Sequence, residues 1–210
     1  FGATVGTPAE NNAGSATTLT VTFGAATAGN LLVAVFSRSI AATWTTVPTG
    51  WTAGPQVTDA AGNFSAKTFW KSAAGGETSV VGTTAAGGGS WRGVVAEFEG
   101  AFEASPLDQS AESEANISAP VTSQTSGTTG TTSQADELAI ACFAVQAFSN
   151  ADTSRVYNNS FTEVIAGGTT NSGRSGAYIA KRILTATGTY SCTFSVTDTG
   201  DEMYGAILTF

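Results

Sequence analysis

The sequence predicts an all-β protein, an antiparallel β-sandwich assembled from two pseudo-repeats. Three observations lead to this fold class. Apolar residues fall in short runs, several segments alternate apolar with polar residues, and glycine-rich turns separate them. No long segment carries the apolar period of an amphipathic helix, so we expect little helix.

The two pseudo-repeats are anchored by two apolar runs, Gly29–Phe36 (GNLLVAVF) and Asp136–Phe143 (DELAIACF), which begin 107 positions apart. Further matches follow in the same order, and the offset drifts only from 107 to 112. The matched segments are Leu31–Phe36 with Leu138–Phe143, Trp51–Thr52 with Phe161–Thr162, Phe69–Lys71 with Ile179–Lys181, Ser79–Val81 with Tyr190–Cys192, and Gly93–Phe98 with Gly205–Phe210. The sequence therefore predicts repeat 1 at about residues 18–100 and repeat 2 at about 120–210, although short β-strands also resemble one another by chance.

Each expected strand has a local signal in the sequence. Thr18–Phe23 alternates, Leu31–Ser37 is apolar on both faces and is expected to be a central strand, and residues 46–51 form a corner marked by Pro and Gly. The other expected strands are Phe1–Val5, Phe64–Lys71, Thr78–Thr83 and Trp91–Glu99, then Leu138–Phe148, Phe161–Ile165, Gly176–Leu184, Thr189–Val196 and Met203–Phe210.

Residues 1–210 are expected to form a single β-sandwich domain, because each copy has too few short strands to bury a core alone. Two sheets would pack face to face, each drawing strands from both copies. The alternative is two small sandwiches joined at residues 101–120. Residues 101–135 connect the copies, and within their second part, Pro120–Gln134, which is almost wholly Thr, Ser and Gly, we expect an ordered edge strand, since this part aligns loosely with Thr18–Phe23.

The composition argues against several classes of partner. Charged residues make up 11% of the chain, against about 25% in a typical globular protein, and the net charge is −8. The eight Lys and Arg residues are scattered, whereas phosphate binding needs clustered cations, so no nucleic-acid partner is expected. No apolar run is long enough for a membrane span. The chain begins with Phe1, which fits a mature secreted protein or a processed virion protein.

The two cysteines, Cys142 and Cys192, both lie in copy two and match valines of copy one, Val35 and Val81. Two valines replaced together suggest positions that face each other, so a disulfide bond between the cysteines is one prediction. It would stabilise the fold by about 4 kcal/mol and imply an oxidising compartment. The alternative is two buried free thiols that pack as small hydrophobes.

The chain contains no histidine, which excludes Ser-His-Asp and Cys-His catalytic systems and histidine metal ligands. Glu97 and Glu99 are the remaining catalytic candidates, because they lie two residues apart on an expected strand and so share a face. The alternative is a solvated outer face, and copy two has Thr209 at the position of Glu97. We therefore expect no enzyme, with a carboxylate-based glycosidase as an alternative.

Two further places in the sequence suit a ligand. Asp198, Asp201 and Glu202, in the turn before the last strand, could hold Ca²⁺ if backbone carbonyls joined them, although their spacing is not that of an EF-hand and a solvated turn is the alternative. Trp44 has no clear counterpart in copy two, so it is the best candidate for an exposed aromatic that contacts a ligand such as a glycan. No other cofactor is expected.

The motifs GNLLVAVFS, VPTGWT, KTFWKSA, WRGVVAEFEG, SPLDQSA and DELAIACF, within about residues 18–210, resemble those of duplicated β-sandwich modules. These jelly-roll-like modules occur in bacteriophage virion surface and tail proteins and in secreted microbial surface proteins. The resemblance implies a part used for display, assembly or adhesion, and it carries over no catalytic residues. The cysteine pair departs from that pattern.

These expectations favour a non-enzymatic structural protein that self-assembles or decorates a repetitive surface, such as a bacteriophage virion protein or an extracellular filament subunit. Its partners would be copies of itself or other virion or surface proteins, and its location extracellular or on a virion surface. The low charge favours self-association, and an exposed N-terminal strand at residues 1–10 would add to a neighbour's sheet edge. A carbohydrate-binding adhesion module is the main alternative.

Overall fold

The structure is a computed structural model that describes residues 1–59, 63–103, 105–146, 154–168, 175–197 and 201–210, apart from the side chains of residues 115–120 and 201. Across these ranges it contains fifteen β-strands and no helix. Every pairing between named strands is antiparallel. The predicted fold class, an all-β protein with antiparallel sheets, is therefore confirmed.

The first half of the chain, residues 1–98, builds one five-stranded sheet in the order β1-β7-β3-β5-β4 and one small sheet that pairs β2 with β6. The bounds of these strands are β1 Thr4–Ala13, β2 Thr18–Thr22, β3 Leu31–Arg38, β4 Thr52–Thr58, β5 Ser65–Ser72, β6 Ser79–Thr83 and β7 Trp91–Phe98. The expectation of a central strand is confirmed, because β5 and β7 both pair along the whole length of β3.

The second half, residues 109–210, builds a five-stranded sheet in the order β12-β13-β10-β15-β8 and a small sheet in the order β11-β14-β9. The bounds are β8 Gln109–Val121, β9 Ser123–Thr125, β10 Leu138–Gln146, β11 Val156–Tyr157, β12 Thr162–Gly167, β13 Ser175–Ile183, β14 Thr193–Ser195 and β15 Asp201–Thr209. The last two residues of the strand expected over Leu138–Phe148 lie outside the described residues. The edge strand expected within Pro120–Gln134 is present as β9, which lies at one edge of the small sheet.

The order of strands is the same in the two large sheets, with β1, β7, β3, β5 and β4 in the places of β8, β15, β10, β13 and β12. The expectation that each sheet would draw strands from both halves is wrong, because each large sheet takes all its strands from one half. Strands near in sequence pair more readily than strands from distant halves. The correspondence also includes β1 and β8, which begin before the limits of 18 and 120 expected for the repeats.

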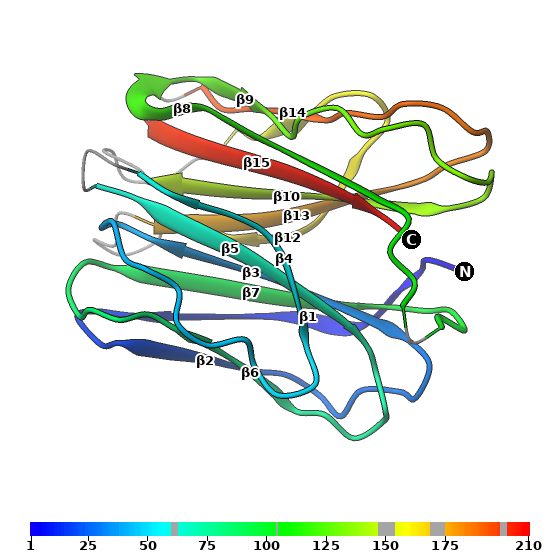
Figure 1. The fold of residues 1–210 in the computed structure, drawn as a ribbon, viewed down its shortest axis with the longest axis horizontal. Helices are drawn as coiled ribbons and strands as arrows, with labels where there is room; N and C mark the ends of the chain where they lie inside the picture. Colours follow the sequence, from blue (N-terminus) through cyan, green and yellow to red (C-terminus); the bar gives the residue numbers. More distant parts are fainter. Residues whose placement is uncertain (60–62, 104, 147–153, 169–174, 198–200) are drawn as a thin grey trace.

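The four sheets are stacked as layers, with the two large sheets face to face in the middle and a small sheet outside each of them (Figure 1). Both chain termini lie at one end of this stack. Three apolar clusters fill the spaces between the layers. The central cluster, which we call the shared core, takes buried residues from both halves, and each outer cluster belongs to one half. Strands β3 and β10 are apolar on both faces because they contact two clusters at once.

The free edges of the large sheets carry irregularities that oppose pairing with another chain. The edge strands β1, β4 and β12 each have a shift of register against their neighbour, and β8 has two along β15. Pro8 lies within the irregular part of β1, and Pro55 lies within that of β4. Bulges and prolines are common ways to protect a sheet edge from aggregation.

Candidate functional site

The two glutamates considered as a catalytic pair have different environments. Glu97 on β7 is buried, and its Oε1 accepts hydrogen bonds from the Thr27 backbone N–H at 2.9 Å and from Asn30 Nδ2 at 2.6 Å. Glu99 is exposed. The expectation that Glu97 points into solvent is wrong, because the turn after β2 covers it and needs an acceptor. Glu97 is positioned to hold this turn.

Trp44 is buried, with an exposed fraction of 8%, so the expectation of an exposed aromatic at this position is wrong. Its ring packs edge to face against Trp91 with centroids 5.6 Å apart, and its centroid lies 6.4 Å from that of the Phe36 ring. Trp44 forms an isolated bridge with Thr84 and lies in the outer core of the first half. Its role in the fold is therefore to fill that core.

The expected disulfide is wrong for this structure, since Cys142 and Cys192 are both free and buried. Cys142 lies in the shared core between the large sheets, whereas Cys192 lies in the outer core of the second half. One large sheet separates the two thiols, so they cannot face each other. Burial raises the pKa of Cys192 to about 12 and also raises the pKa of Cys142, which keeps both thiols protonated and inert at neutral pH.

The structure describes only part of the set of calcium ligands expected from the sequence. Asp198 and the side chain of Asp201 lie outside the described residues. Glu202 is described and is 4% exposed, so it is not part of a solvated turn. Among the described residues, no three His, Cys, Asp or Glu side chains come together in a way that could hold a metal ion. A metal site in this part of the chain would need amide, backbone or water oxygens as well.

Arg38, which the sequence gave no reason to single out, is a fully buried cation at the end of β3. Its guanidinium donates to the carbonyl oxygens of Ala16, Ala86 and Gly88 and to the hydroxyl of Thr84. Its Cζ lies 4.6 Å from the ring centroid of Trp91. Burial lowers the pKa of Arg38. The glycine-rich segment 85–90 is thus a turn that wraps a guanidinium of its own chain.

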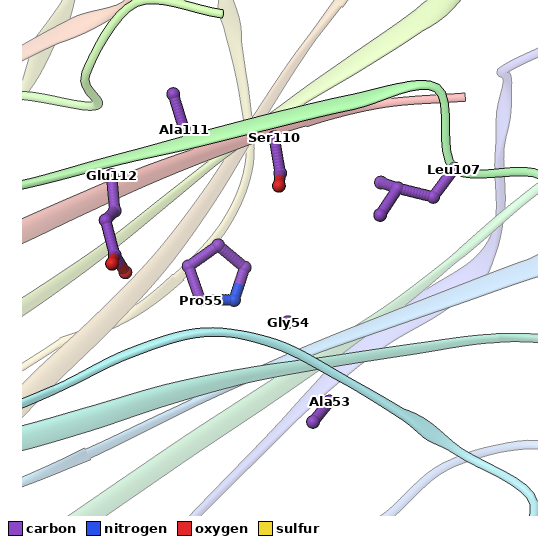
Figure 2. A pocket seen from close by; sticks show the side chains of 7 residues that line it. All are labelled: Ala53, Gly54, Pro55, Leu107, Ser110, Ala111 and Glu112. Atoms are coloured by element: carbon purple, nitrogen blue, oxygen red, sulfur yellow. The ribbon is translucent and has the colours of Figure 1, made fainter.

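A pocket of about 300 Å³ lies at the seam between the halves, where the edge strands β4 and β8 approach each other (Figure 2). In the figure, Leu107, Ser110 and Glu112 extend from β8 and the segment before it toward Gly54 and Pro55 of β4. Glu112 Oε2 accepts a hydrogen bond from the Tyr204 hydroxyl at 3.0 Å. Because the pocket is lined by one carboxylate, one hydroxyl and otherwise by apolar or small residues, it lacks the acid–base pair that hydrolysis of a glycoside needs.

A second pocket, of about 480 Å³, lies at the end of the stack where the termini meet. Phe1, Phe102 and Phe210 line it, with ring centroids 5.4 Å apart for Phe1 and Phe102 and 6.5 Å apart for Phe102 and Phe210. The side chains of Glu103 and Asp108 also line this pocket. It therefore combines aromatic surface with carboxylates.

The opposite end of the shared core is polar. Asp59, Gln146 and Glu202 are buried there, with exposed fractions of 1%, 5% and 4%. Asp59 follows β4 in the first half, while Gln146 ends β10 and Glu202 lies near the start of β15. Sequence reasoning missed Asp59 and Gln146, because only the packing of the two large sheets brings them together.

Comparison with known proteins gave no match: no family model fits the chain, and neither a curated protein nor a solved structure is similar to it at a significant level. In the part of the chain that the structure describes, no helix is long and apolar enough to cross a membrane.

Proposed function

We propose that this chain is a non-enzymatic structural module that self-assembles or decorates a repetitive surface, such as a virion surface or an extracellular filament. The single observation that carries this proposal is the use of charged side chains. The Lys and Arg side chains outside residues 169–174 all bond to oxygen atoms of the same chain.

These cations connect segments of the fold to one another. Arg38 holds the glycine-rich turn, and Lys71 forms an ion pair with Glu77 at 2.6 Å across the turn between β5 and β6. Lys181 of the second half donates to the backbone carbonyl of Gly2 at 2.7 Å and to Thr4 Oγ1 at 3.1 Å, which ties the two halves together. The other pairs are Lys67 with Gln56, Arg92 with Glu10, Arg155 with Glu163, and Arg182 with the Asn159 carbonyl. The use of charged side chains for contacts within the chain is typical of a structural module.

The irregular edges of the large sheets limit which surfaces of the module can mediate assembly. Residues 1–10 are expected from the sequence to add to a neighbour's sheet, but most of them belong to β1 (Thr4–Ala13), which pairs with β7 of its own chain. Because all four edges of the large sheets are irregular, assembly through the outer layers or the loop ends is favoured over addition of strands. Val156, 61% exposed on the outermost strand β11, is an apolar residue on such a layer.

Sedimentation velocity and negative-stain electron microscopy of the purified chain, over a range of concentrations, test this proposal. We expect particles or fibres, and we expect Val156→Lys to weaken them if the outer layer of the second half makes the contact. Val47→Lys is the matched control, because Val47 is also exposed, at 42%, but lies in the first half. A chain that stays monomeric at every concentration and fails to bind any particle would contradict the proposal.

A carbohydrate-binding module is the second candidate, and the pocket beside the termini favours it. The aromatic residues Phe1, Phe102 and Phe210, together with the acidic residues Glu103 and Asp108, give this pocket the mixed apolar and polar lining of ligand sites. A glycan array would detect binding, and Phe102→Ala should remove it. Trp44→Ala would lower stability instead, since Trp44 is part of a core.

A further inference from the structure

The pocket between β4 and β8, which we call the seam pocket, has walls from both halves of the chain (Figure 2). Residues 53–55 line it from the first half, and Leu107 and residues 110–112 line it from the second. In the figure, Leu107 and Glu112 extend into the space from its two ends, and the ring of Pro55 faces it between them. The seam pocket therefore has an apolar end and an acidic end.

The Pro55 wall of the seam pocket is held in place by the irregular part of β4. The register between β4 and β5 shifts between Ala53 and Gln56, which takes Gly54 and Pro55 out of regular pairing. The Thr68 hydroxyl donates to the Pro55 carbonyl oxygen at 2.9 Å. A Cβ atom at position 54 would clash with the same Thr68 side chain. This wall is therefore built into the fold, as is usual for ligand sites.

The acidic end of the seam pocket is oriented by the shared core. Glu112 Oε2 accepts a hydrogen bond at 3.0 Å from the hydroxyl of Tyr204, which is fully buried. Among the described residues, Glu112 Oε1 has no hydrogen-bond donor and no ion pair includes Glu112. Burial, and then the charge of Glu112, raise the pKa of Glu114, because the two carboxylates repel each other. Within the described part of the chain, this end thus carries negative charge without a cation beside it.

We propose that the seam pocket binds an alkylammonium group, with the ammonium against Glu112 and Ser110 and the hydrocarbon chain along Pro55 and Leu107. A carboxylate and a hydroxyl accept the hydrogen bonds of an ammonium, and proline and leucine side chains remove methylene groups from water. The volume of about 300 Å³ is small for a ligand site, so it suits a short aliphatic chain. This inference stands independently of the proposed assembly role.

The contacts of Glu112 favour an ammonium over a guanidinium. A guanidinium pairs best with a carboxylate through two parallel hydrogen bonds, one to each oxygen. The Tyr204 hydroxyl already donates to Oε2 of Glu112, so a guanidinium would have to share that oxygen. An ammonium is a compact charge that can bond Oε1 alone and turn its other N–H groups toward Ser110 and water. We therefore expect pentylamine to bind more tightly than pentylguanidine.

Titration of the isotope-labelled full chain with pentylamine, followed by NMR, tests this proposal. We expect the amide signals of Gly54, Ser110 and Glu112 to shift together and to saturate, and the affinity to fall as NaCl is added. Pentanol has the same chain without the charge and should bind about tenfold more weakly or worse. Ethylamine should bind more weakly than pentylamine, by about fourfold for each buried methylene that it lacks.

Two sources can supply the alkylammonium group, a small free amine or the lysine side chain of a polypeptide. The probe for the second source is Nα-acetyl-lysine amide, with the same compound acetylated at Nζ as its uncharged control. Binding at least as tight as that of pentylamine would assign the pocket to a lysine of a partner polypeptide. Weaker binding than that of pentylamine would assign it to a small amine.

The variant Glu112→Gln removes the charge and keeps an acceptor for Tyr204, so it should weaken pentylamine binding about tenfold or more. Leu107→Ala keeps the charge but should remove most of the difference between pentylamine and ethylamine. Glu99→Gln is the matched control, because Glu99 is an exposed carboxylate that does not line the pocket. Circular dichroism checks that each variant is folded.

The proposal is overturned if pentylamine causes no saturable shift at Gly54, Ser110 and Glu112 of the unsubstituted chain. It is equally overturned if Glu112→Gln binds pentylamine as tightly as Glu99→Gln does, or if pentanol binds as tightly as pentylamine. The first and last of these measurements need no variant, so they decide the matter even if Glu112→Gln fails to fold.

Discussion

Phe36 lies opposite Gly93 in the ladder between β3 and β7, and its ring fills the space that a side chain at position 93 would need. A Cβ atom added to Gly93 would lie 2.8 Å from Phe36 Cε1. The same relationship occurs in the second half, where Phe143 lies opposite Gly205 and a Cβ there would lie 2.9 Å from Phe143 Cε1. An aromatic ring packed over a cross-strand glycine thus appears at corresponding places in both large sheets.

This relationship predicts the cost of adding a methyl group at either glycine. Gly93→Ala and Gly205→Ala should each lower the free energy of unfolding by about 1–3 kcal/mol, because overpacking forces the ring and backbone to shift. Gly24→Ala is the control, since a Cβ at position 24 meets no atom within 4 Å. Urea unfolding of the three variants measures the difference. Equal stability of all three would show that the rings have room to move.

Arg38 is predicted to be one of the most sensitive positions in the first half. Replacement with Met leaves the carbonyls of Ala16, Ala86 and Gly88 without their donor, so we expect a loss of about 3 kcal/mol or more in the free energy of unfolding. Arg182→Met, which removes a partly exposed hydrogen bond to the Asn159 carbonyl, should cost less than about 1 kcal/mol. Similar losses at both positions would contradict the role assigned to Arg38.

Glu97 is predicted to act in folding and not in catalysis. Glu97→Ala removes the acceptor for Thr27 and Asn30 and should cost about 1–3 kcal/mol of stability, whereas Glu97→Gln keeps an acceptor oxygen and should cost less. Glu99→Ala, at an exposed position, should stay within about 0.5 kcal/mol. Thermal and urea unfolding measure these effects. A glycosidase activity that disappears in Glu97→Gln, with stability unchanged, would reverse this assignment.

The two thiols are predicted to be unreactive in the folded protein. Cys142 and Cys192 are buried and free, so a thiol reagent at mildly alkaline pH should leave the native protein unmodified and react with both after unfolding in guanidinium chloride. The melting temperature should not change with reductant. An intact mass or peptide map that shows Cys142 linked to Cys192 in the native protein would refute the placement of these two residues in separate cores.

The acid limb of the stability profile is predicted to depend on Glu77. Burial alone would raise its pKa, but hydrogen bonds from Lys71 and from the Ala74 N–H, with the charge of Lys71, bring the pKa down to about 2. A depressed pKa in the folded state gives stability that is present above the ordinary value of 4.5 and is lost as the pH falls toward about 2. Glu77→Gln should therefore be less stable than the unsubstituted chain at neutral pH.

The difference in the free energy of unfolding between Glu77→Gln and the unsubstituted chain should shrink as the pH falls from 4.5 toward about 2. The pH profile of the unsubstituted chain alone does not isolate Glu77, because burial raises the pKa of Glu202 and Glu137. The contributions of these two residues to stability have the opposite sign and are lost as the pH rises. Glu99→Gln, which removes an exposed carboxylate from the same half, is the control. A constant difference between Glu77→Gln and the unsubstituted chain from neutral to acid pH would contradict the pairing with Lys71.

The class of fold and the faces of many strands follow from local patterns of apolar and polar residues. In the expected strand Phe64–Lys71, alternation places Phe64, Ala66 and Trp70 on one face, and these three residues lie together in the shared core. Alternation is a local property of a strand, so it can be read without knowing which strands are neighbours. The apolar character of Leu31–Ser37 on both faces likewise predicted a central strand, because only such a strand is covered twice.

Which polar residues meet depends on how the two halves pack against each other. Alternation tells which face a side chain occupies, but it does not say what lies across from that face. Asp59 and Glu202 are 143 positions apart in the chain, and they come together because the large sheets of the two halves pack against each other. The burial of Trp44 and Glu97 could not be predicted for the same reason: Trp44 packs onto Trp91 and Phe36, and Glu97 is covered by the turn that carries Thr27, and these partners are not sequence neighbours.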